Sequence, residues 1–346
     1  MRALYSAYTG PLYQVCKGVF TQGKDSCTSG VTKDIGVVAG GYADSAAQDA
    51  FCAGAAVCTI SIIYDQSPNR NDLKPSPANP GAHKPSADNP AFASDLKITL
   101  SGHTVYGILV NPYDSRVPTG KQGVGYRSGC ANCATLTATA TATGDQPETE
   151  YMVTGEHGSP TAPHLIDGCC FDYGNAETTG VDNNAGTMEA VYFGGGVAWG
   201  TGSPGMPRTN GPWVMADLEN GIFAGWDQTM KTDQAISTNT ALKLPFVTAL
   251  IVGDTADKNG GAGRFAVYGG DATSGPLKTM YDGIRPTKDI GYLHPKKQGS
   301  IILGTGGDNS DLGGGEWYEG VMASGAATMV TLNALQANIV AAGYGK

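Results

Sequence analysis

The chain has 346 residues, with 22 Lys and Arg against 31 Asp and Glu, so its formal net charge at pH 7 is −9. This length is sufficient to bury a full core without a metal, and an acidic chain with no basic run lacks the surface that a polyanion requires, so nucleic acid is not an expected partner. Glycine contributes 51 residues, about twice average usage, which favours short strands and tight turns over helices.

Short apolar or alternating runs recur along the chain between clusters of Gly, Pro, Asn and Asp. This pattern is typical of strands that pack one face on a core. In chain order, it predicts strands over residues 58–64, 105–110, 135–143, 188–193, 213–219, 246–252, 264–268, 300–303 and 317–322. Their spacing leaves no room for the crossover helices of a parallel sheet. We therefore expect an all-β fold of antiparallel sheets stacked as a β-sandwich.

Two segments interrupt the strand pattern. Residues 68–90 are rich in proline and poor in aliphatic side chains, which predicts a long surface loop. Apolar residues recur at helical spacing over 332–340 before Gly343, which predicts one short amphipathic helix at the C-terminal end. No repeat or change of composition divides the chain, so a single domain over residues 1–346 is expected, and no apolar run is long enough to span a membrane.

The chain contains eight cysteines, more than a cytosolic enzyme usually carries unless it binds metal or does redox chemistry. A metal site is disfavoured because Cys130 and Cys133 form a C-x-x-C without a second pair at zinc spacing, and the five His residues are scattered. Disulfides and secretion are therefore expected. No apolar export segment follows Met1, so we interpret the leader as already removed. A soluble monomer is expected.

The segment 213–219 places two acids at the end of a strand. Alternation puts Asp217 and Glu219 on one strand face, and Asn220-Gly221 suits a type I′ hairpin turn that would leave Glu219 near a rim. Neighbouring carboxylates push one of the pair toward its protonated form, which is how glycosidases prepare an acid and a base. The plain alternative is two solvated acids on an exposed face.

Three further features could belong to a ligand site. The segment 303–310 runs from a strand through glycines to Asp308, where an acid beside a ligand and a plain glycine turn remain the alternatives, and a phosphate loop is disfavoured because no Lys follows. Cys169 and Cys170 either bond to each other in a strained ring or, as the residues alone slightly favour, pair elsewhere. Trp199, among glycines, could stack on a sugar or fill the core.

Four stretches carry motifs in chain order: YDQS at 64–67, CCFDYGNAE at 169–177, WVMADLEN at 213–220 and ILGTGGDNS at 302–310. Together they resemble the catalytic domain of glycoside hydrolase family 54, the fungal-type α-L-arabinofuranosidases B. Residues 2–6 and 338–342 are similar to the two ends of that domain. The resemblance covers nearly the whole chain, and the stretch through the adjacent cysteines is highly specific.

The resemblance implies a concanavalin-like sandwich of the jelly-roll type. It implies that Glu219 is the nucleophile and Asp308 the general acid/base of a retaining, exo-acting α-L-arabinofuranosidase on arabinoxylan or arabinan, with no cofactor, because two carboxylates supply the proton transfer. Further residues are implied at the arabinose pocket, the last two as a vicinal disulfide: Asp217, Asn220, Gly307, Trp199, Cys169 and Cys170.

The other cysteines and three departures complete the comparison with this pattern. Cys52 and Cys58 match a disulfide of the family, and the remaining four lack recognised counterparts, so their expected pairing is Cys16 with Cys27 and Cys130 with Cys133. The chain reaches Lys346 without an arabinose-binding β-trefoil domain. It also lacks an N-terminal cysteine pair, and the loop at 68–90 differs from the family pattern. No N-x-S/T sequon occurs.

Two alternatives to this function remain. A related retaining glycosidase acting on β-D-xylosides or β-D-galactofuranosides would use the same acids, because these sugars present similar hydroxyls. A lectin-like sandwich would bind sugar without catalysis, since this architecture also hosts sugar-binding proteins. Three other acids on predicted strands are reserve candidates for catalysis: Glu189, Glu316 and Glu319.

Overall fold

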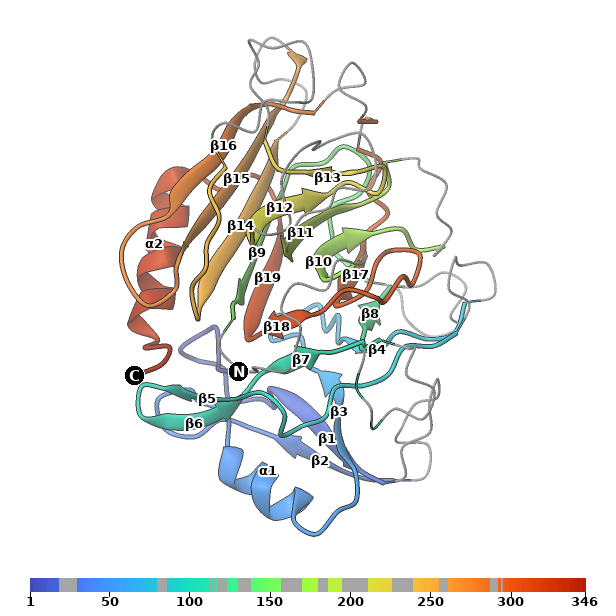
Figure 1. Ribbon diagram of the computed structural model, residues 1–346, viewed down its shortest axis with the longest axis vertical. Helices are drawn as coiled ribbons and strands as arrows, with labels where there is room; N and C mark the ends of the chain where they lie inside the picture. The colour runs from blue at the N-terminus through green and yellow to red at the C-terminus, as the bar shows by residue number, and fades with distance from the viewer. Residues whose placement is uncertain are drawn as a thin grey trace.

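The computed structural model describes residues 1–18, 30–79, 86–112, 114, 116, 123–129, 138–156, 170–179, 186–194, 211–225, 239–254, 261–286, 292, 293 and 295–346. Within these residues strands dominate and two helices occur, which confirms the all-β prediction. Two antiparallel sheets pack face to face as a β-sandwich, and a smaller three-stranded sheet lies at one end (Figure 1).

The two large sheets have seven and five strands, and a helix covers the outer face of the smaller one (Figure 1). The seven-stranded sheet has the order β13 (Ile222–Phe223), β12 (Trp213–Asp217), β11 (Glu189–Gly194), β10 (Asp172–Ala176), β17 (Ser300–Leu303), β8 (Tyr126–Ser128) and β4 (Lys74–Pro75). The five-stranded sheet has the order β16 (Lys278–Ile284), β15 (Arg264–Asp271), β14 (Val247–Asp254), β9 (Glu148–Thr154) and β19 (Glu319–Ser324). Helix α2 (Met329–Ala341) lies along the outer side of the five-stranded sheet (Figure 1).

The predicted C-terminal helix is confirmed as α2. Thr328 caps its start by accepting a hydrogen bond from the backbone N–H of Thr331, and Gly343 follows its end in the left-handed region at φ 76°. Leu332 and Ile339 are buried against the protein. Gln336 donates from Nε2 to the backbone oxygens of Asp271 and Gly275, which ties the helix to the end of β15.

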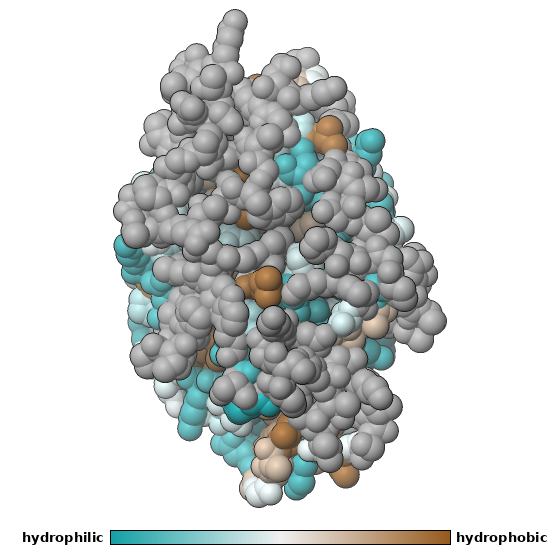
Figure 2. All heavy atoms as spheres, turned by 45° about the vertical axis from the view of Figure 1, so that its right-hand side comes forward, coloured by the Kyte–Doolittle hydropathy of each residue, from teal (hydrophilic) through white to brown (hydrophobic). Residues whose placement is uncertain are grey.

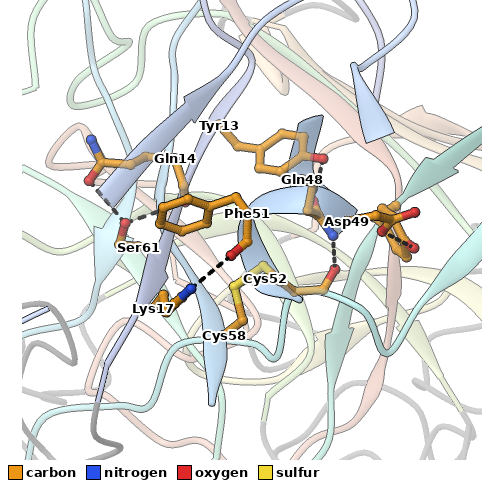
Figure 3. The surroundings of a disulfide bond; sticks show 11 residues. Tyr13, Gln14, Lys17, Gln48, Asp49, Phe51, Cys52, Cys58 and Ser61 are labelled. Atoms are coloured by element: carbon orange, nitrogen blue, oxygen red, sulfur yellow. Dashed lines mark hydrogen bonds between the residues drawn. A yellow bond between two sulfur atoms is a disulfide. The ribbon is translucent and has the colours of Figure 1, made fainter. Parts of the chain in front are cut away.

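The lower end of the molecule contains the three-stranded sheet, helix α1 (Ser45–Cys52) and the hairpin of β5 (Lys97–Leu100) and β6 (His103–Tyr106) (Figure 1). The three-stranded sheet has the order β2 (Val31–Ile35), β1 (Tyr13–Lys17) and β3 (Cys58–Ile63), and β7 (Ile108–Val110) pairs with the distant β18 (Gly315–Trp317) in a separate two-stranded sheet. The expected disulfide between Cys52 and Cys58 joins α1 to β3 (Figure 3). Beside it, Lys17 Nζ donates to the backbone oxygen of Phe51.

Several predicted elements need correction. The strand expected over 105–110 is divided between β6 and β7, because Gly107 leaves the ladder and donates its N–H to Leu96. The strand expected over 317–322 is likewise divided at Tyr318, whose N–H bonds to Val153. Residues 138–143, the described part of the strand expected over 135–143, contain no strand. Helix α1 was not predicted, although Asp44 caps it through Ala47.

Alternation along the seven-stranded sheet separates a core face from an outer face. Val214 and Ala216 of β12 join the main hydrophobic core between the two large sheets. Trp213 and Met215, at the alternate positions, belong to a separate apolar cluster on the other side of the sheet. Asp217 continues the outer-face positions of β12, so the predicted alternation of this strand is confirmed up to that residue.

The described residues expose few large apolar side chains. On the face drawn in Figure 2, hydrophobic side chains of these residues are scattered among hydrophilic ones. Those of the described chain that are exposed are Tyr5, Val31, Val38, Leu312, Met329 and Val330. Neither α1 nor α2 has the length and hydropathy of a membrane-spanning helix, and this holds for the described residues only.

An ionic cluster is enclosed between the two large sheets. Lys297 Nζ lies 3.1 Å from an oxygen of Glu189 on β11 and 3.8 Å from one of Glu148 on β9. Asn175 on β10 donates to Glu148 from its side chain and to Glu150 from its backbone, both at 2.9 Å. Burial raises the pKa of Glu148 to about 8 and that of Glu150 well above its usual range. The raised pKa values favour the neutral forms of Glu148 and Glu150, and Lys297 makes its shortest ionic contact with Glu189.

Removal of that cation should destabilise the sandwich. Lys297→Met leaves the buried carboxylate of Glu189 without its counter-charge, so we expect the free energy of unfolding to fall by about 3 to 5 kcal/mol. Urea denaturation followed by tryptophan fluorescence measures this loss. Lys296→Met is the matched control, because Lys296 is exposed and its loss should cost less than about 0.5 kcal/mol. Equal stability of both variants would show that the cluster is not ionised.

Candidate functional site

The outer face of the seven-stranded sheet carries buried charged side chains on three strands that are not direct neighbours, β12, β10 and β8. Asp172 begins β10, Asp217 ends β12, and Arg127 lies at the centre of β8. Asp172 and Asp217 are fully buried, and Arg127 is 1% exposed. Charged side chains are rarely buried to this extent without partners, so the neighbouring loops must supply the balancing contacts.

Glu219 lies in the turn between β12 and β13, not on the strand as predicted. The strand ends at Asp217, which pairs with Ile222, and the turn is closed by the N–H of Leu218 donating to Gly221. Glu219 adopts a left-handed backbone at φ 66°, which costs free energy for a residue with a side chain. Its N–H donates to Asp217 Oδ1 at 2.7 Å, and this bond helps to hold the unfavourable conformation.

The turn is not the expected type I′, because Asn220 does not share the positive φ that this turn needs at both central positions. The prediction that strand alternation places Asp217 and Glu219 on one strand face is wrong, because Glu219 lies outside the strand, and the two residues are joined instead by the backbone bond from Glu219 to Asp217. Strand periodicity therefore accounts for the position of Asp217, whereas the turn accounts for the position of Glu219 beside it.

Thr187 orients the carboxylate of Glu219. Its backbone N–H donates to Glu219 Oε2 at 2.6 Å, and its hydroxyl donates to the same oxygen. Thr187 lies just before β11, next to the β12–β13 hairpin. Glu219 is 3% exposed. Two donors on one oxygen fix the orientation of the side chain.

Loss of the Thr187 hydroxyl should impair activity. Thr187→Val keeps the shape but removes one hydrogen bond to a charged group, so if Glu219 is the nucleophile that the family resemblance implies, kcat/KM on an aryl arabinofuranoside should fall about tenfold to a hundredfold. Steady-state kinetics measures the loss. Thr187→Ser is the matched control, since it keeps the hydroxyl and should retain most of the rate. Equal losses in both variants would contradict this role.

Asp308 lies in the loop that follows β17, as the sequence predicts. Its Oδ1 accepts hydrogen bonds from the backbone N–H and the hydroxyl of Ser310, at 2.9 and 2.6 Å. The loop is closed by the N–H of Gly306 donating to the Ser310 oxygen at 2.7 Å. Asp308 is partly exposed, in contrast to the buried acids around it.

Arg127 supports this loop from below. One of its terminal nitrogens donates to the backbone oxygens of Gly306 and Gly307, and the other donates to the backbone oxygen of Glu177. Burial lowers the pKa of Arg127, while the charges of Glu177, Asp88 and Asp308 oppose that shift. The guanidinium is thus a buried cation placed directly under the glycines that lead to Asp308.

Cys170 lies between the segments that carry Glu219 and Asp308. Its Sγ lies 3.6 Å from Asp217 Oδ2 and 3.6 Å from the Ser310 hydroxyl. Asp217 in turn bonds to the backbone of Glu219, and Ser310 bonds to Asp308. This continuous series of contacts links the turn after β12 to the loop after β17.

Burial, followed by electrostatic repulsion within this site, raises the pKa of two carboxyl groups. Burial, then the charges of Asp308 and Glu219, raise the pKa of Asp217 to about 7, against the hydrogen bond from the Glu219 backbone. Burial and the charge of Glu219 raise the pKa of Glu177 to about 8, against the charge of Arg127. Glu177 packs on Gly307, where a Cβ would lie 1.8 Å from its Oε2, so a glycine is required there.

The shifted pKa of Glu177 has a consequence for stability. Between its ordinary pKa of 4.5 and its raised pKa of about 8 in the folded chain, the folded chain keeps a proton that the unfolded chain has lost. Stability therefore falls as pH rises through this window, by up to about 1.4 kcal/mol per pH unit. We expect Glu177→Gln to show a weaker fall in urea denaturation between about pH 5 and about pH 8. Glu156→Gln, at a partly exposed position, should keep the wild-type slope, and an unchanged slope in Glu177→Gln would be contrary to expectation.

Cys170, Asp172 and Asp217 offer potential metal-ligand atoms within 4.8 Å of one another. Cys170 is disulfide-bonded, so it has no thiolate to give to a metal. Two mutually repelling carboxylates then remain, and these three residues alone offer too few ligands to hold a metal ion. The partners of the disulfide-bonded Cys16 and Cys170 lie outside the described residues.

Comparison with known families identifies the chain. The family model for the catalytic domain of α-L-arabinofuranosidase B matches residues 1–345. The chain belongs to this family. It is 44% identical over 346 residues to α-L-arabinofuranosidase B of Emericella nidulans, which covers 99% of this chain and 58% of the relative. It is 43% identical to a Trichoderma koningii protein named arabinofuranosidase/β-xylosidase, again over 99% of this chain and 59% of the relative.

Solved structures of the family agree in fold. A mutant of a GH54 α-L-arabinofuranosidase soaked with 4-nitrophenyl α-L-arabinofuranoside is 41% identical, with a TM-score of 0.77, over 99% of this chain and 61% of the other. An arabinofuranosidase complexed with arabinofuranosyl-α-1,2-xylobiose gives the same values. The chain thus spans about three-fifths of the length of the relatives that it matches.

The structure brings together most of the family residues predicted from sequence. Asp217, Glu219 and Asp308 share one site, Gly307 packs on Glu177 within it, and Asn220 follows Glu219 in the turn. Two residues predicted at the pocket, Cys169 and Trp199, lie outside the described residues. So do three cysteines of the expected disulfide pairing: Cys27, Cys130 and Cys133.

The reserve acids lie elsewhere. Glu189 belongs to the ionic cluster between the sheets, Glu316 accepts a hydrogen bond from the Tyr318 hydroxyl, and Glu319 pairs with Arg2. Sequence reasoning missed four site residues: Arg127, Asp172, Glu177 and Thr187. The second and third lie in the specific stretch 169–177, which could have drawn attention to them, whereas nothing in the sequence marks Thr187 or Arg127.

Proposed function

We propose that the chain is the catalytic unit of a retaining, exo-acting α-L-arabinofuranosidase that removes terminal α-L-arabinofuranosyl groups from arabinoxylan-type or arabinan-type substrates. The observation that carries the proposal is the meeting of Glu219 and Asp308, from two different loops, around Cys170 and Asp217. Membership of the family and a solved relative complexed with arabinofuranosyl-α-1,2-xylobiose support the choice of sugar.

The proposed mechanism is double displacement. Glu219 attacks the anomeric carbon while Asp308 protonates the departing glycosidic oxygen, which leaves an arabinofuranosyl ester on Glu219. Asp308 then removes a proton from water, and the water releases the sugar with its original anomeric configuration. The two donors from Thr187 hold Glu219 for the attack, and retention requires the two carboxyl groups roughly 5 to 5.5 Å apart.

Asp217, Asn220 and Gly307 are proposed to contact the sugar hydroxyls, together with Trp199 and the disulfide of Cys169 and Cys170. Support for Asp217 comes from its contact with Cys170 and from the neighbouring charges of Glu219 and Asp308. A carboxylate that accepts hydroxyl bonds in a buried site discriminates strongly between sugars that differ in a hydroxyl.

We further propose a secreted monomer in which residues 1–346 form one catalytic domain. The disulfide between Cys52 and Cys58 supports oxidising export, and one hydrophobic core includes residues from Met1 to Tyr344. Gel filtration with light scattering tests the monomer, and a mass of two chains would contradict it.

Proton NMR during hydrolysis tests the mechanism. The anomeric signal that appears first from an α-L-arabinofuranoside should be that of the α-anomer, before mutarotation begins. First appearance of the β-anomer would exclude double displacement, because a single inversion places water on the opposite face.

A second candidate is hydrolysis of β-D-xylosides, which the name of the Trichoderma koningii relative favours. Rates on 4-nitrophenyl α-L-arabinofuranoside and 4-nitrophenyl β-D-xyloside decide between the two. We expect the arabinofuranoside to have the higher kcat/KM, and faster release from the xyloside would displace the first candidate.

A further inference from the structure

Asp172 is a buried acid that the mechanism above does not use. Its side chain is fully buried on the outer face of β10, and neither carboxylate oxygen receives an N–H or hydroxyl donor from the part of the chain that the structure describes. Its backbone oxygen, by contrast, accepts from Gly304 at 2.8 Å in the neighbouring segment. Buried carboxylates normally accept hydrogen bonds, so the state of this side chain requires an explanation.

The neighbouring carboxyl group of Asp217 explains how the Asp172 side chain can be buried without an N–H or hydroxyl donor. Ligand atoms of Asp172, Asp217 and Cys170 lie within 4.8 Å of one another, and both acids are fully buried. Two carboxylates this close cannot both carry a charge away from water, because their repulsion adds to the cost of burial. At least one of the two acids therefore favours its protonated form, and its acidic hydrogen is then available to the oxygens of the other.

The other contacts decide which acid keeps the proton. Asp217 Oδ1 accepts the N–H of Glu219 at 2.7 Å, which favours its ionised form, whereas Asp172 has no such donor among the described residues. Burial, followed by the charges of Asp217 and Asp308 and the hydrogen bond to Asp217, raises the pKa of Asp172 well above its usual range, with a smaller effect from Glu177. The same bond from Asp172 lowers the pKa of Asp217.

We propose that Asp172 is a positioning residue that keeps its proton and donates it to Asp217, so that Asp217 is the member of the pair that ionises. Asp217 is then held from both sides, by the Asp172 hydroxyl and by the N–H of Glu219. The bond to Glu219 supports the left-handed backbone of that residue. Asp172 therefore acts on the predicted nucleophile through Asp217, without touching the substrate.

This role of Asp172 in activity rests on the proposed function, whereas its protonation does not. Infrared spectroscopy at about pH 8, where ordinary carboxyl groups are ionised, measures protonation directly. The wild-type spectrum minus that of Asp172→Asn should contain one positive carbonyl band of a protonated carboxyl group. Absence of this band in the difference spectrum would overturn the proposal, whether or not the protein hydrolyses arabinofuranosides.

Kinetics of two substitutions tests the positioning. Asp172→Asn keeps an N–H donor toward Asp217, so its kcat/KM on 4-nitrophenyl α-L-arabinofuranoside should stay within about threefold of wild type. Asp172→Leu has a similar size but no donor, so kcat/KM should fall about tenfold to a hundredfold. Without the donor, ionisation of Asp217 is also disfavoured, and the acidic limb of the kcat/KM profile should move to higher pH in the Leu variant alone.

The outcomes are decisive in both directions. Rescue by Asn, with a shifted pH profile in Leu, supports the proposal, since a merely structural loss would lower the rate without moving the limb. An Asn variant as impaired as Leu would overturn it. If Asp172→Leu fails to fold, the Asn variant and its infrared spectrum still decide. Wild-type protein inactive on every arabinofuranoside would refute the proposed function, and the infrared band would remain the test of the proton.

Discussion

Glu219→Gln is expected to lower kcat on 4-nitrophenyl α-L-arabinofuranoside by about 10⁴-fold or more. Gln keeps the size of the side chain, but it has no charged oxygen with which to attack the anomeric carbon. The Thr187 donors would then face a neutral amide. Release of nitrophenolate measures the rate, and substrate binding should persist because the hydroxyl contacts proposed for Asp217 remain.

The control for this variant is Glu156→Gln, the same substitution at a partly exposed position beyond β9. It should keep the wild-type rate, and both variants should unfold at similar urea concentrations. A Glu219→Gln protein with undiminished hydrolysis would end the assignment and return attention to Glu189, Glu316 and Glu319. A folded variant that binds arabinose-containing oligosaccharide without cleaving it is the expected product.

Asp308→Asn should affect two classes of substrate unequally. General acid catalysis contributes about 10²-fold to 10⁴-fold, and an arabinoxylan oligosaccharide should lose this full amount because its leaving oxygen needs a proton. Nitrophenolate departs without protonation, so the aryl substrate should show a smaller loss in kcat/KM. Its turnover should instead be limited by the second step, in which water has lost its base.

Azide gives an independent test of the same residue. A small anion needs no base to attack the arabinofuranosyl ester on Glu219, so azide should accelerate turnover of the aryl substrate by Asp308→Asn and yield an arabinofuranosyl azide. Asp34→Asn, at an exposed position on β2, should show neither the loss nor the acceleration. Equal losses on both substrates, with no effect of azide, would exclude Asp308 as the acid/base.

Local sequence patterns located the acids of the site but not their contacts. The alternation of β12 placed Asp217 on the outer face because strand side chains repeat every second residue. An apolar run ending in glycines placed Asp308 at the end of β17. The bonds from Thr187 to Glu219, and from Arg127 to the Asp308 loop, join segments far apart in the chain, and no local pattern encodes them.

The missed strands also have physical causes. β10 has the sequence DYGNA, in which Asp, Gly and Asn all disfavour strands, so only its partners β11 and β17 secure it. β9 was missed although it is central to the five-stranded sheet. Glu148 and Glu150 have the polarity of solvent-facing residues, yet they point into the sandwich because Lys297 and Asn175 receive them there.

Arg127 favours one position of the negative charge during the proposed catalytic cycle. In the proposed double displacement, formation of the ester neutralises Glu219 while Asp308 gives up its proton, so one negative charge migrates from the hairpin after β12 to the loop after β17. The guanidinium is anchored to that second loop through the carbonyls of Gly306 and Gly307, and its field acts on Asp308. A fixed cation beside Asp308 lowers the energy of the covalent intermediate, in which Asp308 is charged, relative to the resting enzyme, in which Glu219 is charged. Arg127 would therefore stabilise the arabinofuranosyl ester without any movement of the protein.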